Sequence, residues 1–115
     1  MTLAEIAKEL ELEVLTATQD LDQRTPIAGY ASDMLSRVMA HAPRDGALWV
    51  TLQSHANIVA VAAVLGLSGI VITEGERPDE QTIAKANQMR IPLLATRQRT
   101  FGVVGNLWRL GLRDA

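Results

Sequence analysis

The chain has 115 residues, 48% hydrophobic and 21% charged, a balance that is typical of one folded globular domain and excludes a disordered chain. Its net charge of −2, with no block of Lys or Arg, argues against nucleic-acid binding, which needs a clustered basic face. The absence of cysteine excludes disulfides and thiolate metal ligands. We expect a cytoplasmic protein without a membrane span, because the longest apolar stretch, 58–65, is too short to cross a bilayer.

The first part of the chain predicts a helix, a strand and a polar loop. Thr2 followed by Glu5 is a capping-box pattern, and apolar residues at helical spacing then predict a short helix over 2–10. A strand is expected at about 13–16. The stretch "TATQDLDQRTP" over 16–26 has no periodicity and ends in a proline, so it is interpreted as a loop, the most mobile part of the chain.

Short strands and helices then alternate to the end of the chain. Strands of four to six residues alternating with helices of about ten are typical of successive βαβ units. The sequence therefore predicts an α/β fold, a three-layer sandwich with a mainly parallel sheet of about five short strands. After "IAGYAS", the expected elements are a helix at about 33–41, a strand at 47–52, a helix at 57–65, a strand at 69–73, a helix at 79–89, a strand at 91–96 and a helix ending near 111.

The polar string "QSHAN" at 53–57 separates a predicted strand from an apolar helix. Parallel α/β sheets bind ligands beyond the carboxyl ends of their strands, where helix N-termini present N–H groups. The string is thus either a ligand site or only a helix cap, since Ser54 and Asn57 are ordinary capping residues. The side chains expected to converge at this edge are Gly29, Tyr30, Ser32, Asp33, Gln53, Ser54, His55, Asn57, Thr73, Glu74, Gly75 and Thr96.

The sequence has none of the standard enzyme signatures. The P-loop, the dinucleotide-binding glycine motif and the nucleophile elbow are all missing. His41 and His55 do not have metal-ligand spacing, so we expect no metal site and no cofactor. Asp33 and Glu74 are either an acid–base pair at the sheet edge or two solvated surface acids. We therefore expect no catalytic residues.

The helix over 58–65 has no polar side chain on any face, so something must cover its outer side. A partner copy is one solution and packing between helices of one chain is the other. The C-terminal helix also places apolar residues at helical spacing, with a tryptophan of the kind enriched in interfaces. We expect a homodimer. Its interface candidates are Val59, Ala62, Ala63, Phe101, Val104 and Trp108.

Three motifs resemble those of a known domain family. The segments "SDMLS" at 32–36, "QSHAN" at 53–57 and "TEG" at 73–75 resemble the DRTGG domain family, in particular its short stand-alone members. Ser54-His55 stand where relatives carry Asp-Arg, and Thr73-Glu74-Gly75 stand where they carry Thr-Gly-Gly. The resemblance covers 27–111, with 1–26 as an N-terminal helix, strand and polar loop of the same single domain.

The resemblance implies a fold like the N-terminal domain of HPr kinase, without the catalytic P-loop domain. DRTGG domains accompany CBS nucleotide-sensing domains and phosphotransacetylases, where they act as regulatory or dimerising modules. It therefore favours the site interpretation of "QSHAN". It implies a non-catalytic homodimer that senses a small anion or nucleotide, with a module docking a larger enzyme and a small enzyme of unknown reaction as the alternatives.

Overall fold

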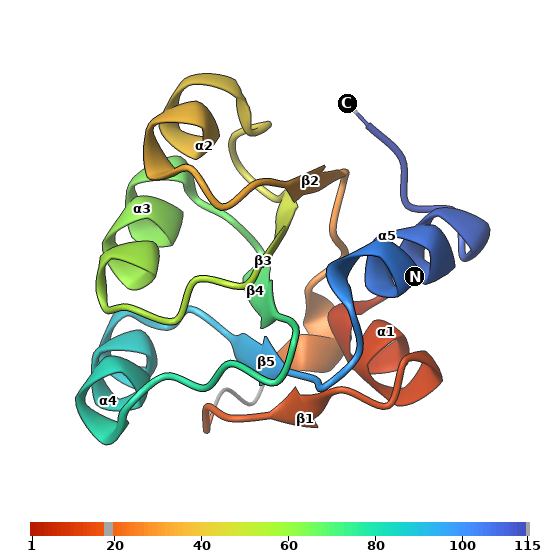
Figure 1. Cartoon of the computed structure of the whole chain (residues 1–115). Coiled ribbons are helices and arrows are strands. Elements are labelled where there is room, and N and C mark those ends of the chain that lie inside the picture. Colours follow the sequence, from red (N-terminus) through yellow and green to blue (C-terminus); the bar gives the residue numbers. More distant parts are fainter. Residues whose placement is uncertain (18–19, 115) are drawn as a thin grey trace.

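A computed structural model describes residues 1–17 and 20–114 (Figure 1). Within these residues, no helix combines the length and the apolar character that crossing a membrane requires. The helices and strands, in chain order, are α1 Leu3–Glu9, β1 Glu13–Val14, the 3-10 turn η1 Leu21–Gln23, β2 Gly29–Ala31, α2 Leu35–His41, β3 Leu48–Thr51, α3 Asn57–Leu65, β4 Gly69–Ile72, α4 Glu80–Met89, β5 Leu93–Ala95 and α5 Thr100–Arg109.

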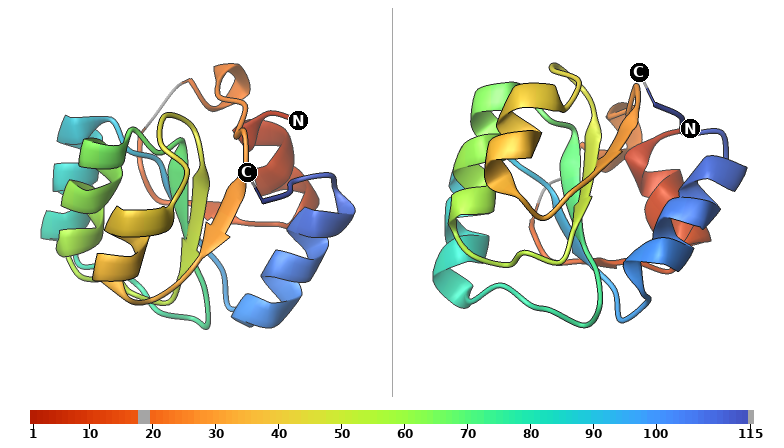
Figure 2. Two further views of the ribbon diagram at one scale, coloured as in Figure 1. Left: turned by 90° about the horizontal axis from the view of Figure 1, so that it is seen from above. Right: turned by 45° about the horizontal axis from the view of Figure 1, so that its top comes forward.

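The five strands form one sheet in the order β1-β5-β4-β3-β2. Strands β2 to β5 are parallel, and β1 pairs antiparallel with β5, with Glu13 opposite Ala95. Helices α2, α3 and α4 cover one face of the sheet, while α1 and α5 cover the other (Figures 1 and 2). The expected three-layer α/β sandwich with a mainly parallel sheet is confirmed.

The central strands β3 and β4 are buried at every residue, and their side chains alternate between two cores. Trp49 and Ile70 pack with α2, α3 and α4, whereas Leu48 and Val71 pack with α1 and α5. The indole Nε1–H of the fully buried Trp49 donates to the carbonyl oxygen of Ser32 at 2.9 Å. Two apolar faces on each strand therefore require a helical layer on each side.

The predicted N-terminal helix and its capping box are confirmed. The Thr2 hydroxyl accepts from the backbone N–H of Glu5 at 3.2 Å, and the Glu5 carboxylate accepts from the backbone N–H of Thr2 at 2.9 Å. These bonds hold the pKa of Glu5 below its ordinary value. Helix α1 then buries Leu3 and Ile6 against the sheet.

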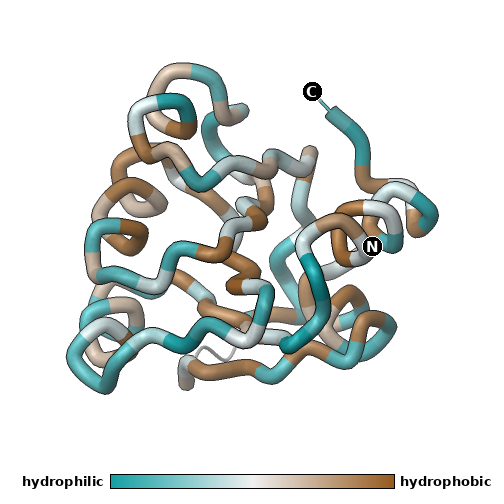
Figure 3. Tube along the Cα trace, viewed as in Figure 1, coloured by the Kyte–Doolittle hydropathy of each residue, from teal (hydrophilic) through white to brown (hydrophobic). Residues whose placement is uncertain are grey.

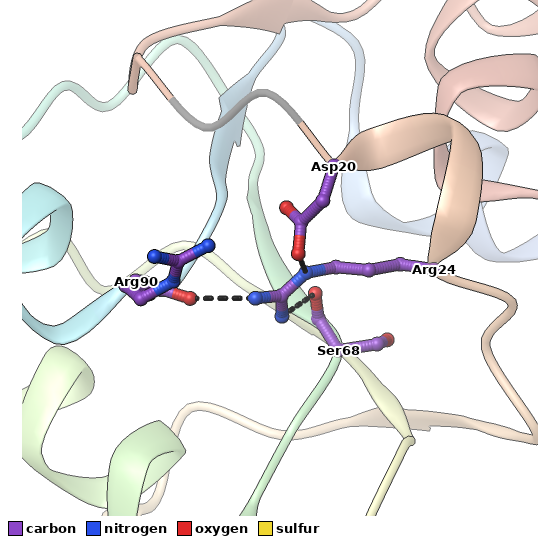
Figure 4. A network of polar contacts seen from close by, with 4 residues as sticks. All are labelled: Asp20, Arg24, Ser68 and Arg90. Atoms are coloured by element: carbon purple, nitrogen blue, oxygen red, sulfur yellow. Dashed lines mark hydrogen bonds and ion pairs between the residues drawn. The ribbon is translucent and has the colours of Figure 1, made fainter.

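The polar loop predicted over 16–26 is fixed to the sheet through Arg24; residues 18 and 19 lie outside the described residues (Figure 4). The Arg24 guanidinium pairs with Asp20 at 3.0 Å and donates to the carbonyl oxygens of Ser68 at 3.3 Å and Arg90 at 2.9 Å. Ser68 precedes β4, and Arg90 follows α4. The guanidinium thus satisfies carbonyl groups at the amino end of the strands, away from the edge where a ligand site was expected.

Helix α3 is covered on both flanks by its own chain. It lies between α2 and α4 on the sheet, and its apolar residues form a nearly continuous band along the trace (Figure 3). Val59 and Ala62 are fully buried within the subunit, so the prediction that they contribute to a dimer interface is wrong. On the outer side Val64 remains 63% exposed.

The difference between the two faces of α3 is testable with one substitution at two positions. Val59→Ala removes buried methyl groups and should lower the free energy of unfolding by about 2 kcal/mol. Val64→Ala, at a residue that no other part of the same chain covers, should change it by about 0.5 kcal/mol or less when the protein is dilute enough to be a monomer. Urea unfolding followed by circular dichroism measures both. An equal loss of unfolding free energy in both variants would contradict the assignment of Val59 to the buried face of α3 and of Val64 to its exposed face.

Candidate functional site

The polar residue Asp33, expected at the ligand site, stabilises the end of a neighbouring strand instead. Its Oδ1 accepts from the Thr51 hydroxyl and from the backbone N–H of Leu52, both at 2.8 Å. The Gln53 side-chain amide donates to the Asp33 carbonyl oxygen at 3.1 Å. The preceding Ser32 hydroxyl accepts from the backbone N–H of Met34 at 3.2 Å. These bonds hold the loop after β2 against the loop after β3.

The residues after β4 hold the start of α5. The Thr73 side chain is buried, and its hydroxyl lies 2.6 Å from the Thr100 hydroxyl. Glu74 has φ 65°, and its Oε2 accepts from the backbone N–H of Thr100 at 2.7 Å. Asp33 and Glu74 therefore have separate hydrogen-bond partners on different elements, which does not support an acid–base pair.

The twelve predicted site residues do not share one pocket. Gly29 and Tyr30 lie within β2, a strand that the sequence analysis did not place, and they line a groove beside α5. Gly75 and Thr96 line a pocket of about 180 Å³ with Arg97. The prediction that all twelve converge is wrong for these groups, although Gln53, Ser54 and His55 do line one cleft together.

That cleft lies beyond the carboxyl ends of β3 and β4, where the loops that lead into α3 and α4 meet. It is open to solvent and has a volume of about 650 Å³. We call it the α3–α4 cleft. It is lined by Leu52, Gln53, Ser54, His55, Ala56, Glu76, Arg77, Asp79, Gln81, Thr82 and Lys85.

One side of the α3–α4 cleft is the capped N-terminus of α4. The Asp79 carboxylate accepts from the backbone N–H of Thr82 at 2.8 Å. This bond lowers the pKa of Asp79, and the nearby His55 lowers it further. On the opposite side, His55 Nδ1 accepts from the backbone N–H of Asn57 at 3.4 Å.

The cationic residues of the α3–α4 cleft are Arg77 and Lys85. The Arg77 guanidinium binds both oxygens of Glu13 on β1, at 2.9 and 3.0 Å. This pair lowers the pKa of Glu13 and raises the pKa of Arg77. Across residues 1–17 and 20–114, no three His, Asp or Glu side chains come together as a metal site. The cleft lining thus combines two cationic side chains, Arg77 and Lys85, with two acidic ones, Glu76 and Asp79.

Arg77, Asp79 and Lys85 were not predicted as site residues. The sequence did indicate a helix opening at Asp79, and the observed strand order, in which β3 lies beside β4, places that opening next to "QSHAN". The residues on the first turns of the following helix could therefore have been included. Lys85 follows Asp79 by six residues, so it lies on the second turn of α4, and no motif identifies it.

The Asp79 cap predicts a specific pH dependence of stability. Asp79→Ala should lower the thermal midpoint by a few degrees at neutral pH, because the cap of α4 is lost. Since the folded-state pKa is depressed, the charged cap stabilises above the unfolded-state pKa, and its contribution is lost as pH falls through the folded-state value. Thermal unfolding between acid and neutral pH measures this difference.

Asp79→Asn is the matched control. It keeps a capping oxygen but has no titrating group, so it should stay folded and lose part of the acid sensitivity. An Asp79→Ala variant whose midpoint parallels the parent at every pH would contradict the cap.

Two comparisons with known proteins bear on this arrangement. The structure is similar, with a TM-score of 0.71 and 19% sequence identity, to the crystal structure of the CBS and DRTGG domains of the regulatory region of Clostridium perfringens pyrophosphatase in complex with the activator diadenosine tetraphosphate. The match covers 90% of this chain but only 44% of that one. At this identity the likeness establishes the fold. No curated protein sequence matches the chain.

A family model settles the relationship that the motifs suggested. The DRTGG domain model matches residues 5–110, so it includes α1 and β1 as well as the part that resembled the family by its motifs. The fold of the similar structure, which contains a DRTGG domain, agrees with that match. The chain belongs to the DRTGG domain family.

Proposed function

We propose that this chain is a non-catalytic regulatory domain that binds a nucleotide or another phosphate-bearing anion in the α3–α4 cleft. The observation that carries the proposal is the position of His55, Arg77 and Lys85 around one open cleft at the carboxyl ends of β3 and β4. This is the edge at which parallel α/β sheets bind ligands. The cleft volume of about 650 Å³ suits a small-molecule ligand.

The chemistry of the α3–α4 cleft favours phosphate recognition by side chains. The Asp79 carboxylate accepts from the Thr82 N–H at the start of α4, and its negative charge there disfavours an anion at the first turn of this helix. Arg77 provides a planar donor, and its partner Glu13 is more than half exposed, so a phosphate competes with only a weak surface pair. Gln53 and Gln81 add neutral donors and acceptors for a nucleoside.

The structural likeness supports the ligand class. The similar region of the Clostridium perfringens protein is regulatory and was crystallised with a nucleotide activator. This chain spans less than half of that region. Regulation of a partner enzyme by this chain is therefore part of the proposal. A non-catalytic role is further supported by the hydrogen bonds of Asp33 and Glu74, since these bonds engage both carboxylates considered for acid–base chemistry.

Homodimerisation is the second part of the proposal, and the outer side of α3 supports it. The sequence argument required a cover for this helix, and Val64 with the exposed Ala60 is the part that α2 and α4 leave uncovered. Ala63 is half-buried beside them. Two copies related by a two-fold axis would cover this surface with its own equivalent.

Ligand binding is tested by thermal unfolding with AMP, ATP, diadenosine tetraphosphate, pyrophosphate and acetyl phosphate. A ligand at a hundred times its dissociation constant stabilises a folded protein by about 2.7 kcal/mol, a shift of several degrees for a domain of this size. The shift should be lost in His55→Ala and Lys85→Ala. Lys8→Ala, an exposed change on α1, is the control and should keep it. No shift with any compound, or an undiminished shift in both cleft variants, would contradict the site.

The dimer is tested by sedimentation velocity over a range of protein concentrations. The parent should sediment with the mass of two chains, and Val64→Asp should return it to one, because the carboxylate would be desolvated at the interface. Phe101→Asp, on the opposite face of the sheet, should leave the dimer unchanged. A single-chain mass at every concentration would reject the dimer, and dissociation by Phe101→Asp alone would move the interface to α5.

A further inference from the structure

The outer side of α5 has an exposed aromatic stripe. Phe101 is 92% exposed and Trp108 is 48% exposed, and the half-buried Val104 lies between them at helical spacing. Of the four aromatic residues in the chain, Trp49 belongs to the core, and Tyr30 on β2 packs against that same core on the α2–α4 face of the sheet. Aromatic side chains left on a surface in this way are typical of a protein interface.

An apolar groove lies between the stripe and the sheet. It has a volume of about 240 Å³ and runs between β2 and α5. We call it the β2–α5 groove. The Arg113 guanidinium lies over the Trp108 ring, 4.6 Å from its centroid, and donates to the Trp108 carbonyl oxygen. The side chains that matter for recognition in the groove are Val104, Leu107, Trp108, Leu112 and Arg113.

Strand β2 is an edge of the sheet, so one side of its backbone has no neighbouring strand. In its parallel pairing with β3, alternate residues bond inward: Ala28 accepts from Leu48, and Ser32 donates to Val50. The backbone N–H and C=O groups of Gly29 and Ala31 consequently point away from β3, toward the open edge of the sheet. The Gly29 N–H donates to the Arg113 carbonyl oxygen at 3.0 Å, which confirms this direction. The exposed Ala31 presents its N–H and C=O at the position where another strand would pair.

The positive charge of this surface indicates which kind of partner it binds. Residues 97–113 contain four of the eleven basic side chains of the protein and none of the thirteen acidic ones. Arg99, Arg109 and Arg113 adjoin or contact the aromatic stripe, and all three are exposed. Asp114 at the groove and Glu74 at the first turn of α5 are the acidic groups found there. Two copies packed through this stripe would bring six arginines together, and such like-charge pairing is unfavourable.

We propose that the β2–α5 groove binds an extended acidic segment of a partner protein. The segment adds a strand beside β2 through Ala31, inserts a large apolar side chain into the groove, and pairs its carboxylates with Arg99, Arg109 and Arg113. Addition of a strand to an exposed sheet edge is a general mode of peptide recognition. The concave groove and the edge strand favour a protein over a flat anionic membrane. The inference does not depend on a ligand in the α3–α4 cleft, and it is tested without one.

The test is an NMR titration of the full chain, labelled with ¹⁵N. The probe is a short synthetic peptide of alternating Glu and Val with one central Phe, and the control peptide has Lys in place of every Glu. Saturable amide shifts should occur at Ala31 and along α5 with the acidic peptide only. Binding should weaken as salt is added, because the arginines are exposed.

Matched variants separate the backbone and charge contributions. Arg109→Glu should weaken binding roughly fivefold, while Arg44→Glu, an exposed reversal on the loop before β3, should not. Ala31→Pro removes an outward N–H without breaking the pairing with β3, and should weaken binding about threefold to tenfold. A dispersed amide spectrum establishes that a variant is folded. If Ala31→Pro does not fold, Arg109→Glu still tests the proposal.

Three results would overturn the proposal. Equal binding of the acidic and basic peptides would remove the role of charge. Shifts confined to other surfaces, or no shifts at millimolar peptide, would remove the site. Phosphatidylserine vesicles or a single-stranded oligonucleotide that produce the same shifts, while the peptide does not, would assign the surface to a membrane or to nucleic acid.

Discussion

The burial of β3 and β4 on both faces is the constraint on which the rest of this structure depends. Every residue from Leu48 to Thr51 and from Gly69 to Ile72 is buried, so each strand needs a helical layer on both sides. Helices α2, α3 and α4 connect successive parallel strands and provide one layer. The other layer consists of α1 and α5, the helices at the two ends of the chain. Closing the second core therefore brings both ends of the chain together behind the sheet.

This arrangement leaves the polar chemistry at the carboxyl ends of the strands, and much of it is structural. A loop that follows a buried strand must satisfy its backbone groups near an apolar core. Asp33 does this for Leu52, and Glu74 does it for Thr100. The side chains left for a ligand are those on the next loops outward, which explains why the cleft lies between α3 and α4.

Periodicity in the sequence was sufficient to predict the fold class, but it did not predict which surfaces are free to bind a ligand or a partner. Strand and helix patterns gave the order of the helices and of every strand except β2, because buried parallel strands and their helices have distinct periods. The apolar helix α3 was assigned to an interface, although neighbouring helices cover most of it; pattern alone cannot tell a flank from an outer face. Asp33 and Glu74 were grouped as site residues because a hydrogen bond to a distant backbone N–H leaves no sequence signature. The basic surface around α5 was missed because the four arginines of residues 97–113 are separated by up to ten residues.

The loop between β4 and α4 physically links the two surfaces proposed for function. Its first residues, Thr73 and Glu74, bind Thr100 at the start of α5. Its later residues, Arg77 and Asp79, line the α3–α4 cleft. Coupling between a ligand and a partner requires an element that both of them bias. A ligand that draws Arg77 away from Glu13 acts on the same short loop that fixes the first turn of α5, next to Phe101. One segment of chain and two hydrogen bonds thus join the cleft to the end of the aromatic stripe.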